Sequence, residues 1–141
     1  MGMREETIVR EFCNAWGDGE RGPDIDRIVS MFAEDASWQL YVPGGPVIRG
    51  RAALRAEIDR QMGYVRGTQC GITHIVSSGS LVMTERLDHF IKNGHRAAHA
   101  LMAVFELDDQ GLITAWREYF DTWDLARQTG SEPGRLAGIE G

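Results

Sequence analysis

The chain has 141 residues, a formal net charge of −6, 43% apolar residues and 26% charged residues. This length fits one domain whose core needs no disulfides, and the composition is that of an ordinary globular protein. The negative charge and the scattered arginines give no basic footprint for nucleic acid or for an anionic membrane. Without an apolar leader or a run of the roughly 18 apolar residues that a spanning helix needs, we expect a soluble cytoplasmic protein.

The first 62 residues predict three helices and one strand. Apolar residues recur at helical spacing over residues 4–16, and a second helix is expected to begin near Pro23, whose fixed φ suits a first turn. Residues 34–42 have strand chemistry and end at the turn-rich segment PGGP. A third helix is expected over residues 50–62, with Leu54 and Ile58 on one face.

The rest of the chain predicts four strands in two hairpins. Residues 71–91 form one pair, joined near Ser78 and Gly79, and residues 96–121 form the other, with a turn at residues 108–111. Helices followed by antiparallel strands indicate an α+β domain over residues 1–128, and the Gly-rich residues 129–141 are expected to be a flexible tail. The element order resembles the cystatin-like, nuclear-transport-factor-2-like (NTF2-like) cone, in which N-terminal helices pack on a curved mixed, mostly antiparallel sheet.

A charged pair interrupts an apolar strand in the segment TERLDHF, residues 84–90. Arg86 and Asp88 point to the same face as Thr84 and Phe90, because strand residues two apart share a face. Asp121 closes the last strand and offers a second carboxylate. A guanidinium between two buried carboxylates would leave one group as a base and the other as a proton donor. A structural ion pair, with Asp121 capping a helix-like segment after it, is the alternative interpretation.

Two segments resemble the signature stretches of the limonene-1,2-epoxide hydrolase family: LVMTERLDHF (residues 81–90) and MAVFELDDQGLITAWREYFD (residues 102–121). This resemblance also implies the NTF2-like, SnoaL-like fold, no cofactor and a homodimer. The family hydrolyses an epoxide to a vicinal diol in one acid–base step. By position, Asp121 would be the base that activates water, Asp88 the acid that protonates the epoxide oxygen, and Arg86 the bridge between them.

One departure from the family concerns the water. The family has Tyr-x-Asn on its first strand, where this chain has Trp38 and Leu40. A one-residue bulge would turn Gln39 and Tyr41 inward, or Tyr119 would supply a hydroxyl. The residues expected to bind a hydrophobic, terpenoid- or steroid-like epoxide are Trp38, Leu40, Tyr41, Phe90 and Tyr119. An isomerase or cyclase that uses the same Asp pair, and a non-catalytic binding module, remain the alternatives.

The remaining polar residues predict no further site. The four histidines lack the spacing of a metal site, and His99 is expected to be a core or interface residue. Cys13 and Cys70 are expected to be buried thiols without zinc spacing.

Overall fold

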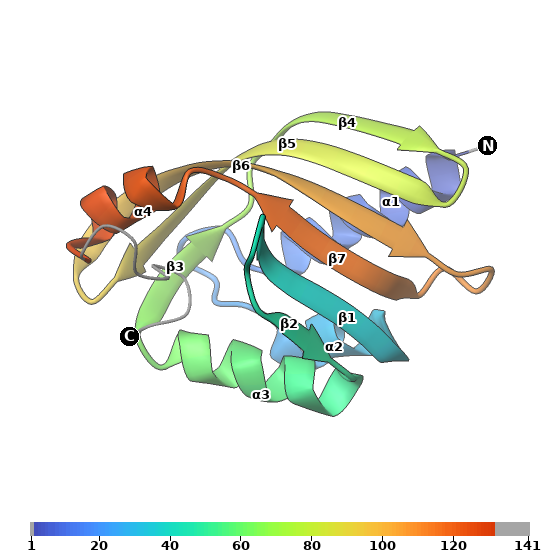
Figure 1. Cartoon of the computed structure of the whole chain (residues 1–141), viewed down its shortest axis with the longest axis horizontal. Helices are drawn as coiled ribbons and strands as arrows, with labels where there is room; N and C mark the ends of the chain where they lie inside the picture. Colours follow the sequence, from blue (N-terminus) through green and yellow to red (C-terminus); the bar gives the residue numbers. More distant parts are fainter. Residues whose placement is uncertain (1, 132–141) are drawn as a thin grey trace.

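The computed structural model describes residues 2–131, and Figure 1 shows their arrangement. The elements in chain order are α1 (Met3–Ala15), α2 (Ile25–Ser30), β1 (Phe32–Val42), β2 (Val47–Arg49), α3 (Arg51–Met62), β3 (Val65–Gln69), β4 (Ile72–Ser78), β5 (Leu81–Lys92), β6 (His95–Leu107), β7 (Ile113–Tyr119) and α4 (Thr122–Thr129).

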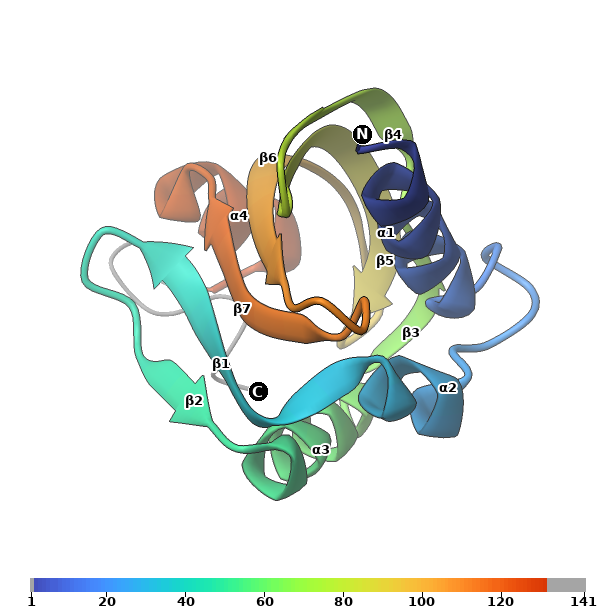
Figure 2. The same ribbon diagram turned by 90° about the vertical axis from the view of Figure 1, so that its right-hand side faces the viewer.

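The strands form a mixed sheet in the order β2-β1-β7-β6-β5-β3, and β4 pairs with part of β5. β1 and β7 run parallel, whereas the other paired strands are antiparallel. The sheet curls strongly, and α1, α2 and α3 lie against its concave side (Figure 2). Long strands with one buried face and a strong twist produce this curl, which leaves an interior between sheet and helices.

An aromatic cluster fills one end of that interior. The ring of Phe12 on α1 meets the rings of Phe32, Phe105 and Trp116 edge to face at centroid distances of 5.2–5.5 Å. Trp38 stacks on Trp116 from the neighbouring strand, with centroids 4.3 Å apart and an interplanar angle of 6°. These side chains close the interior on one side. The open part of the interior therefore lies where β5 and β7 end and β6 begins.

The expected helices and the expected longer strands are present, and the structure adds two short strands that the sequence does not predict. β2 and β3 are short strands, of 3 and 5 residues, in segments for which the sequence predicts no helix or strand. α4 ends at Thr129, so the first residue of the expected tail is helical, and residues 132–141 of that tail lie outside the described residues. Within residues 2–131, no helix is both long and apolar enough to cross a membrane.

Candidate active site

The interior opens as a cavity of about 930 Å³, the solvent at its mouth included. Its wall combines residues from β1, β3, β5, β6 and β7 with residues from α3 and α4. Most of the wall is apolar or aromatic, and Trp16, Trp38, Leu40, Phe90, Trp116, Phe120 and Leu125 belong to it. Such a cavity suits a hydrophobic ligand, which would be oriented by the few polar groups that it contacts.

Three charged side chains meet in this cavity wall: Arg86 lies between Asp88 and Glu118. Nη2 of Arg86 donates to Oδ2 of Asp88 at 2.9 Å and to Oε2 of Glu118 at 3.0 Å, and its Nε donates to Oδ1 of Asp88 at 3.2 Å. The Arg86 side chain is 3% exposed and each carboxylate side chain is 13% exposed. One guanidinium therefore holds two nearly buried carboxylates in a fixed geometry.

The two carboxylates differ in their hydrogen bonds. Asp88 also accepts the backbone N–H of Gly71 at 3.2 Å, in addition to both bonds from Arg86. Burial raises the pKa of Glu118 to about 7; Arg86 lowers it and the neighbouring Asp88 raises it. Burial also opposes the charge of Arg86, but the negative groups around it keep the pKa of its guanidinium well above the usual value. The site thus offers a carboxyl group that exchanges its proton near neutral pH.

Strand alternation explains how these residues come together. On β5, Val82, Thr84 and Arg86 are buried, and the residues between them are exposed. On β7, Trp116 points inward with Glu118, whereas Arg117 pairs with Glu106 and Tyr119 is exposed. β6 lies between the two strands, so the Arg86 side chain reaches across it to Glu118.

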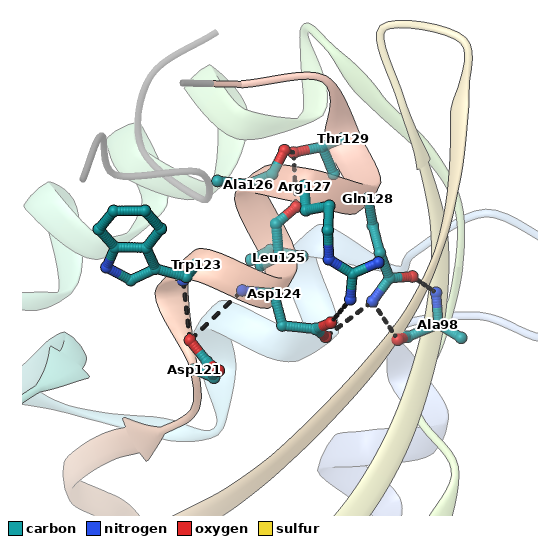
Figure 3. A network of polar contacts seen from close by, with 9 residues as sticks. All are labelled: Ala98, Asp121, Trp123, Asp124, Leu125, Ala126, Arg127, Gln128 and Thr129. Atoms are coloured by element: carbon teal, nitrogen blue, oxygen red, sulfur yellow. Dashed lines mark hydrogen bonds and ion pairs between the residues drawn. The ribbon is translucent and has the colours of Figure 1, made fainter. Parts of the chain in front are cut away.

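The structure corrects the expected contact of Asp121 with Arg86. Asp121 is exposed and lies at the N-cap of α4, where its Oδ1 accepts the backbone N–H of Trp123 at 2.9 Å and of Asp124 at 3.3 Å (Figure 3). Asp121 shares parity with Arg117 and Tyr119, and both of these also lie on the outer side of the sheet. The second carboxylate at Arg86 is Glu118, which the sequence reasoning missed. The signal was its parity with Trp116, since a large apolar side chain directly before a charged residue, Arg117, indicates the inward face of a strand.

Replacing Asp121 with alanine is expected to destabilise the protein by about 1 kcal/mol, the usual cost of an N-cap side chain. Turnover at a temperature well below the unfolding transition should stay close to that of the unmodified protein. Denaturant unfolding and an activity assay on the same preparation measure both effects. Asp121→Asn is the matched control, because asparagine also caps helices. A large loss of turnover in this folded control would show that Asp121 does have a catalytic role.

Four of the five expected substrate-binding residues line the cavity: Trp38, Leu40, Tyr41 and Phe90. The fifth, Tyr119, is 41% exposed on the outer side of the sheet and is corrected for the same reason of parity. The β1–β7 register shifts between Gln39 and Val42, which allows two consecutive residues, Leu40 and Tyr41, to face the cavity. The expected bulge therefore turns Tyr41 inward, whereas the side-chain amide of Gln39 donates to the carbonyl of Gly45 at 3.4 Å.

The other polar residues of this region contribute in different ways. Nη1 of Arg86 approaches Sγ of Cys13 at 3.9 Å, and both cysteines are free thiols. Within the described part of the chain, no group of three or more His, Cys, Asp or Glu side chains could hold a metal ion. His99, which the sequence reasoning assigned to the core or an interface, is buried and also lines the cavity.

The chain is similar to known proteins in both sequence and structure. The family model described as the limonene-1,2-epoxide hydrolase catalytic domain matches residues 4–130. Epoxide hydrolase EphG of Mycobacterium tuberculosis (strain ATCC 25618 / H37Rv) is 33% identical over 117 residues, which cover 83% of this chain and 73% of that protein. The solved structure of an M. tuberculosis LEH-like epoxide hydrolase is 32% identical and superposes with a TM-score of 0.74, covering 89% of this chain and 88% of that one.

A more distant structure supports the fold alone. An NTF2-like protein of unknown function from Burkholderia pseudomallei K96243 superposes with a TM-score of 0.77 at 18% identity, covering 91% of this chain and 98% of that one. The expected α+β, NTF2-like fold is therefore confirmed. The expected enzyme class, an epoxide hydrolase, is also confirmed by the family model and the relatives at 32–33% identity. The chain belongs to the limonene-1,2-epoxide hydrolase family.

Proposed function

We propose that this protein hydrolyses a hydrophobic epoxide to a vicinal diol in one acid–base step carried by Asp88, Arg86 and Glu118. The observation that carries the proposal is the single Arg86 nitrogen that donates to both carboxylates at the wall of an apolar cavity. One carboxyl group and one carboxylate held in this way can act together, as acid and as base.

Glu118 is the proposed base. It lies on β7, the strand that pairs with β1, and the family holds its nucleophilic water beside its first strand. Glu118 takes one proton from water while the water oxygen attacks a ring carbon. The carbon–oxygen bond of the epoxide breaks, and the ring oxygen takes the proton of Asp88. The sum is epoxide plus water to diol, after which the proton returns from Glu118 to Asp88.

Arg86 is the proposed bridge, not a proton carrier, because its pKa stays well above the usual value. Its Nη2 lies within 3.0 Å of an oxygen of each carboxylate, so it stabilises whichever group is ionised as the proton changes place. Leu40 occupies one of the two family positions that hold the water, so Tyr41, which also lines the cavity, is the proposed replacement hydroxyl.

Hydrolysis in H₂¹⁸O tests the reaction. The purified protein is incubated with terpenoid and steroid epoxides, and the products are analysed by mass spectrometry. A diol with one labelled oxygen is the expected product. Trp38 and Leu40 at the water-holding positions favour one competing function, isomerisation or cyclisation in the same cavity; this reaction would consume the epoxide without incorporating label. A binding module would consume none.

The activity is expected to fall as pH rises above about 7. The pair shares one proton, and it is expected to lose that proton as pH passes the pKa of Glu118, about 7. The doubly ionised pair has a base but no acid, so kcat/KM should drop toward alkaline pH by about tenfold per unit. A pH profile of kcat/KM measures this; a rate that keeps rising through pH 9 would exclude the pair as the source of the acid.

A further inference from the structure

His99 is a polar residue directly beside Asp88 on the cavity wall. It is the cross-strand partner of Asp88 in the β5–β6 ladder, and its side chain lines the cavity although the residue is only 7% exposed. Directly opposed residues have Cβ atoms about 5 Å apart. A ligand whose epoxide oxygen meets Asp88 therefore brings its neighbouring atoms close to the His99 ring.

Aromatic rings fix the orientation of this imidazole. It packs edge to face on Phe120 at a centroid distance of 4.5 Å and on Phe90 at 6.0 Å. The helix α4 covers this end of the cavity, and its residue Leu125 lines the cavity wall. The side chain of Gln128 holds α4 on β6, because it bonds both the N–H and the carbonyl of Ala98 at 2.8 Å (Figure 3). Among residues 2–131, neither ring nitrogen of His99 has a hydrogen-bond partner. The two aromatic contacts hold the ring in place and leave its nitrogens free to bind a ligand.

The charge state of His99 decides which ligand groups it can bind. Burial lowers the pKa of this histidine to about 4, although Asp88 acts in the opposite direction. The imidazole is therefore neutral at pH 7 and offers one N–H donor and one nitrogen acceptor. This combination matches a hydroxyl group, which both donates and accepts, and makes His99 a poor carrier of protons at neutral pH.

We propose that His99 binds a hydroxyl group of the substrate, and that the preferred substrate is a hydrophobic epoxide with this hydroxyl on the carbon next to the epoxide ring. The position of the hydroxyl follows from the position of His99 beside Asp88. The inference rests on the proposed hydrolysis and adds the substrate class. A histidine that merely filled space would favour the hydroxylated epoxide no more than the unsubstituted one, since a buried nitrogen selects only a ligand that pairs with it.

Two matched epoxides test the assignment: limonene 1,2-epoxide, and the same molecule with a hydroxyl on the ring carbon next to the epoxide. The ratio of their kcat/KM values is measured for the unmodified protein, for His99→Phe and for His99→Gln. The unmodified protein should prefer the hydroxylated epoxide, and His99→Phe should reduce that preference about 10–100-fold, the size of one buried hydrogen bond. His99→Gln should keep most of it, because glutamine also donates and accepts. An unmodified protein without preference, or a ratio unchanged in His99→Phe, overturns the inference.

A binding measurement separates this inference from the proposed function. The tryptophans of the cavity wall allow fluorescence titration with two unreactive probes: p-menthane, the saturated hydrocarbon skeleton of limonene, and menthol, its alcohol. Tighter binding of menthol than of p-menthane, with this difference lost in His99→Phe, supports the role of His99. If the same protein hydrolyses neither epoxide, the proposed hydrolysis is refuted but the role of His99 is not. Equal affinity of both probes in the unmodified protein refutes the role of His99, whatever the epoxide assay shows.

Discussion

Replacing Glu118 with glutamine is expected to lower kcat about 10²–10⁴-fold, the usual contribution of a general base. Glutamine has nearly the same shape, and its amide oxygen can still accept the Arg86 hydrogen bond, which measures 3.0 Å from the carboxylate. The change therefore removes the proton acceptor and leaves the cavity wall in place. Steady-state kinetics on an epoxide that the unmodified protein hydrolyses measures the effect.

Thermal unfolding of the same preparation shows that the variant is folded. Asp121→Asn is the control in kinetics: it makes a similar carboxylate-to-amide change only three residues further along the chain, on a side chain that caps α4 outside the cavity. If Glu118→Gln keeps the rate of the unmodified protein, the carboxylate bonded to Arg86 is structural and the proposed base is wrong.

Azide distinguishes the base from the acid. Azide attacks an epoxide without losing a proton, so it should restore ring opening, as azido alcohol, in Glu118→Gln but not in Asp88→Asn. The free protein favours the opposite location of the shared proton, because Asp88 accepts three hydrogen bonds, from Gly71 and Arg86, and burial raises the pKa of Glu118 to about 7. Rescue of Asp88→Asn alone would therefore exchange the two roles, with Asp88 as base and Glu118 as acid.

The sequence was a good guide wherever one pattern decided the structure. Helical spacing around Phe12 and Ile28 and the alternation along residues 81–92 were strong enough to predict the main elements and the α+β class. The short strands β2 and β3 were missed because each is stabilised by pairing with a distant strand, β1 or β5. Such pairing depends on the fold and has little signature in three to five residues.

The candidate site shows a different limit of sequence reasoning. Arg86 and Asp88 were predicted together because they lie two residues apart on one strand. The partner carboxylate comes from β7, and choosing between Glu118 and Asp121 required knowing which residues of that strand face inward and where the strand ends. β7 ends at Tyr119, so Asp121 already belongs to the helix cap, and strand alternation no longer applies to it. His99 was underestimated because its importance comes only from the β5–β6 register.

The second large effect is expected from Arg86→Met. Methionine keeps much of the length of the side chain but leaves two nearly buried carboxylates without their cation, a loss that costs about 3–5 kcal/mol in other proteins. Activity should fall with it, since the carboxylates lose the group that holds them together. Denaturant unfolding at pH 7.5 measures the free energy of unfolding in both proteins.

The pH dependence of that loss separates electrostatics from packing. Burial raises the pKa of Glu118 and Arg86 lowers it, so without Arg86 the stability of the variant should recover as pH falls and this group takes up a proton. The unmodified protein, in which Arg86 still bonds both carboxylates, should gain less over the same range. Arg117→Met is the matched control, because Arg117 lies next to Glu118 but pairs with Glu106 on the exposed side of the sheet at 2.6 Å. Its removal should cost at most about 1 kcal/mol, the range for exposed pairs. If Arg86→Met were as mild as this control at every pH, the two carboxylates would have to be solvated in solution, and the acid–base pair proposed for this cavity would lose its physical basis.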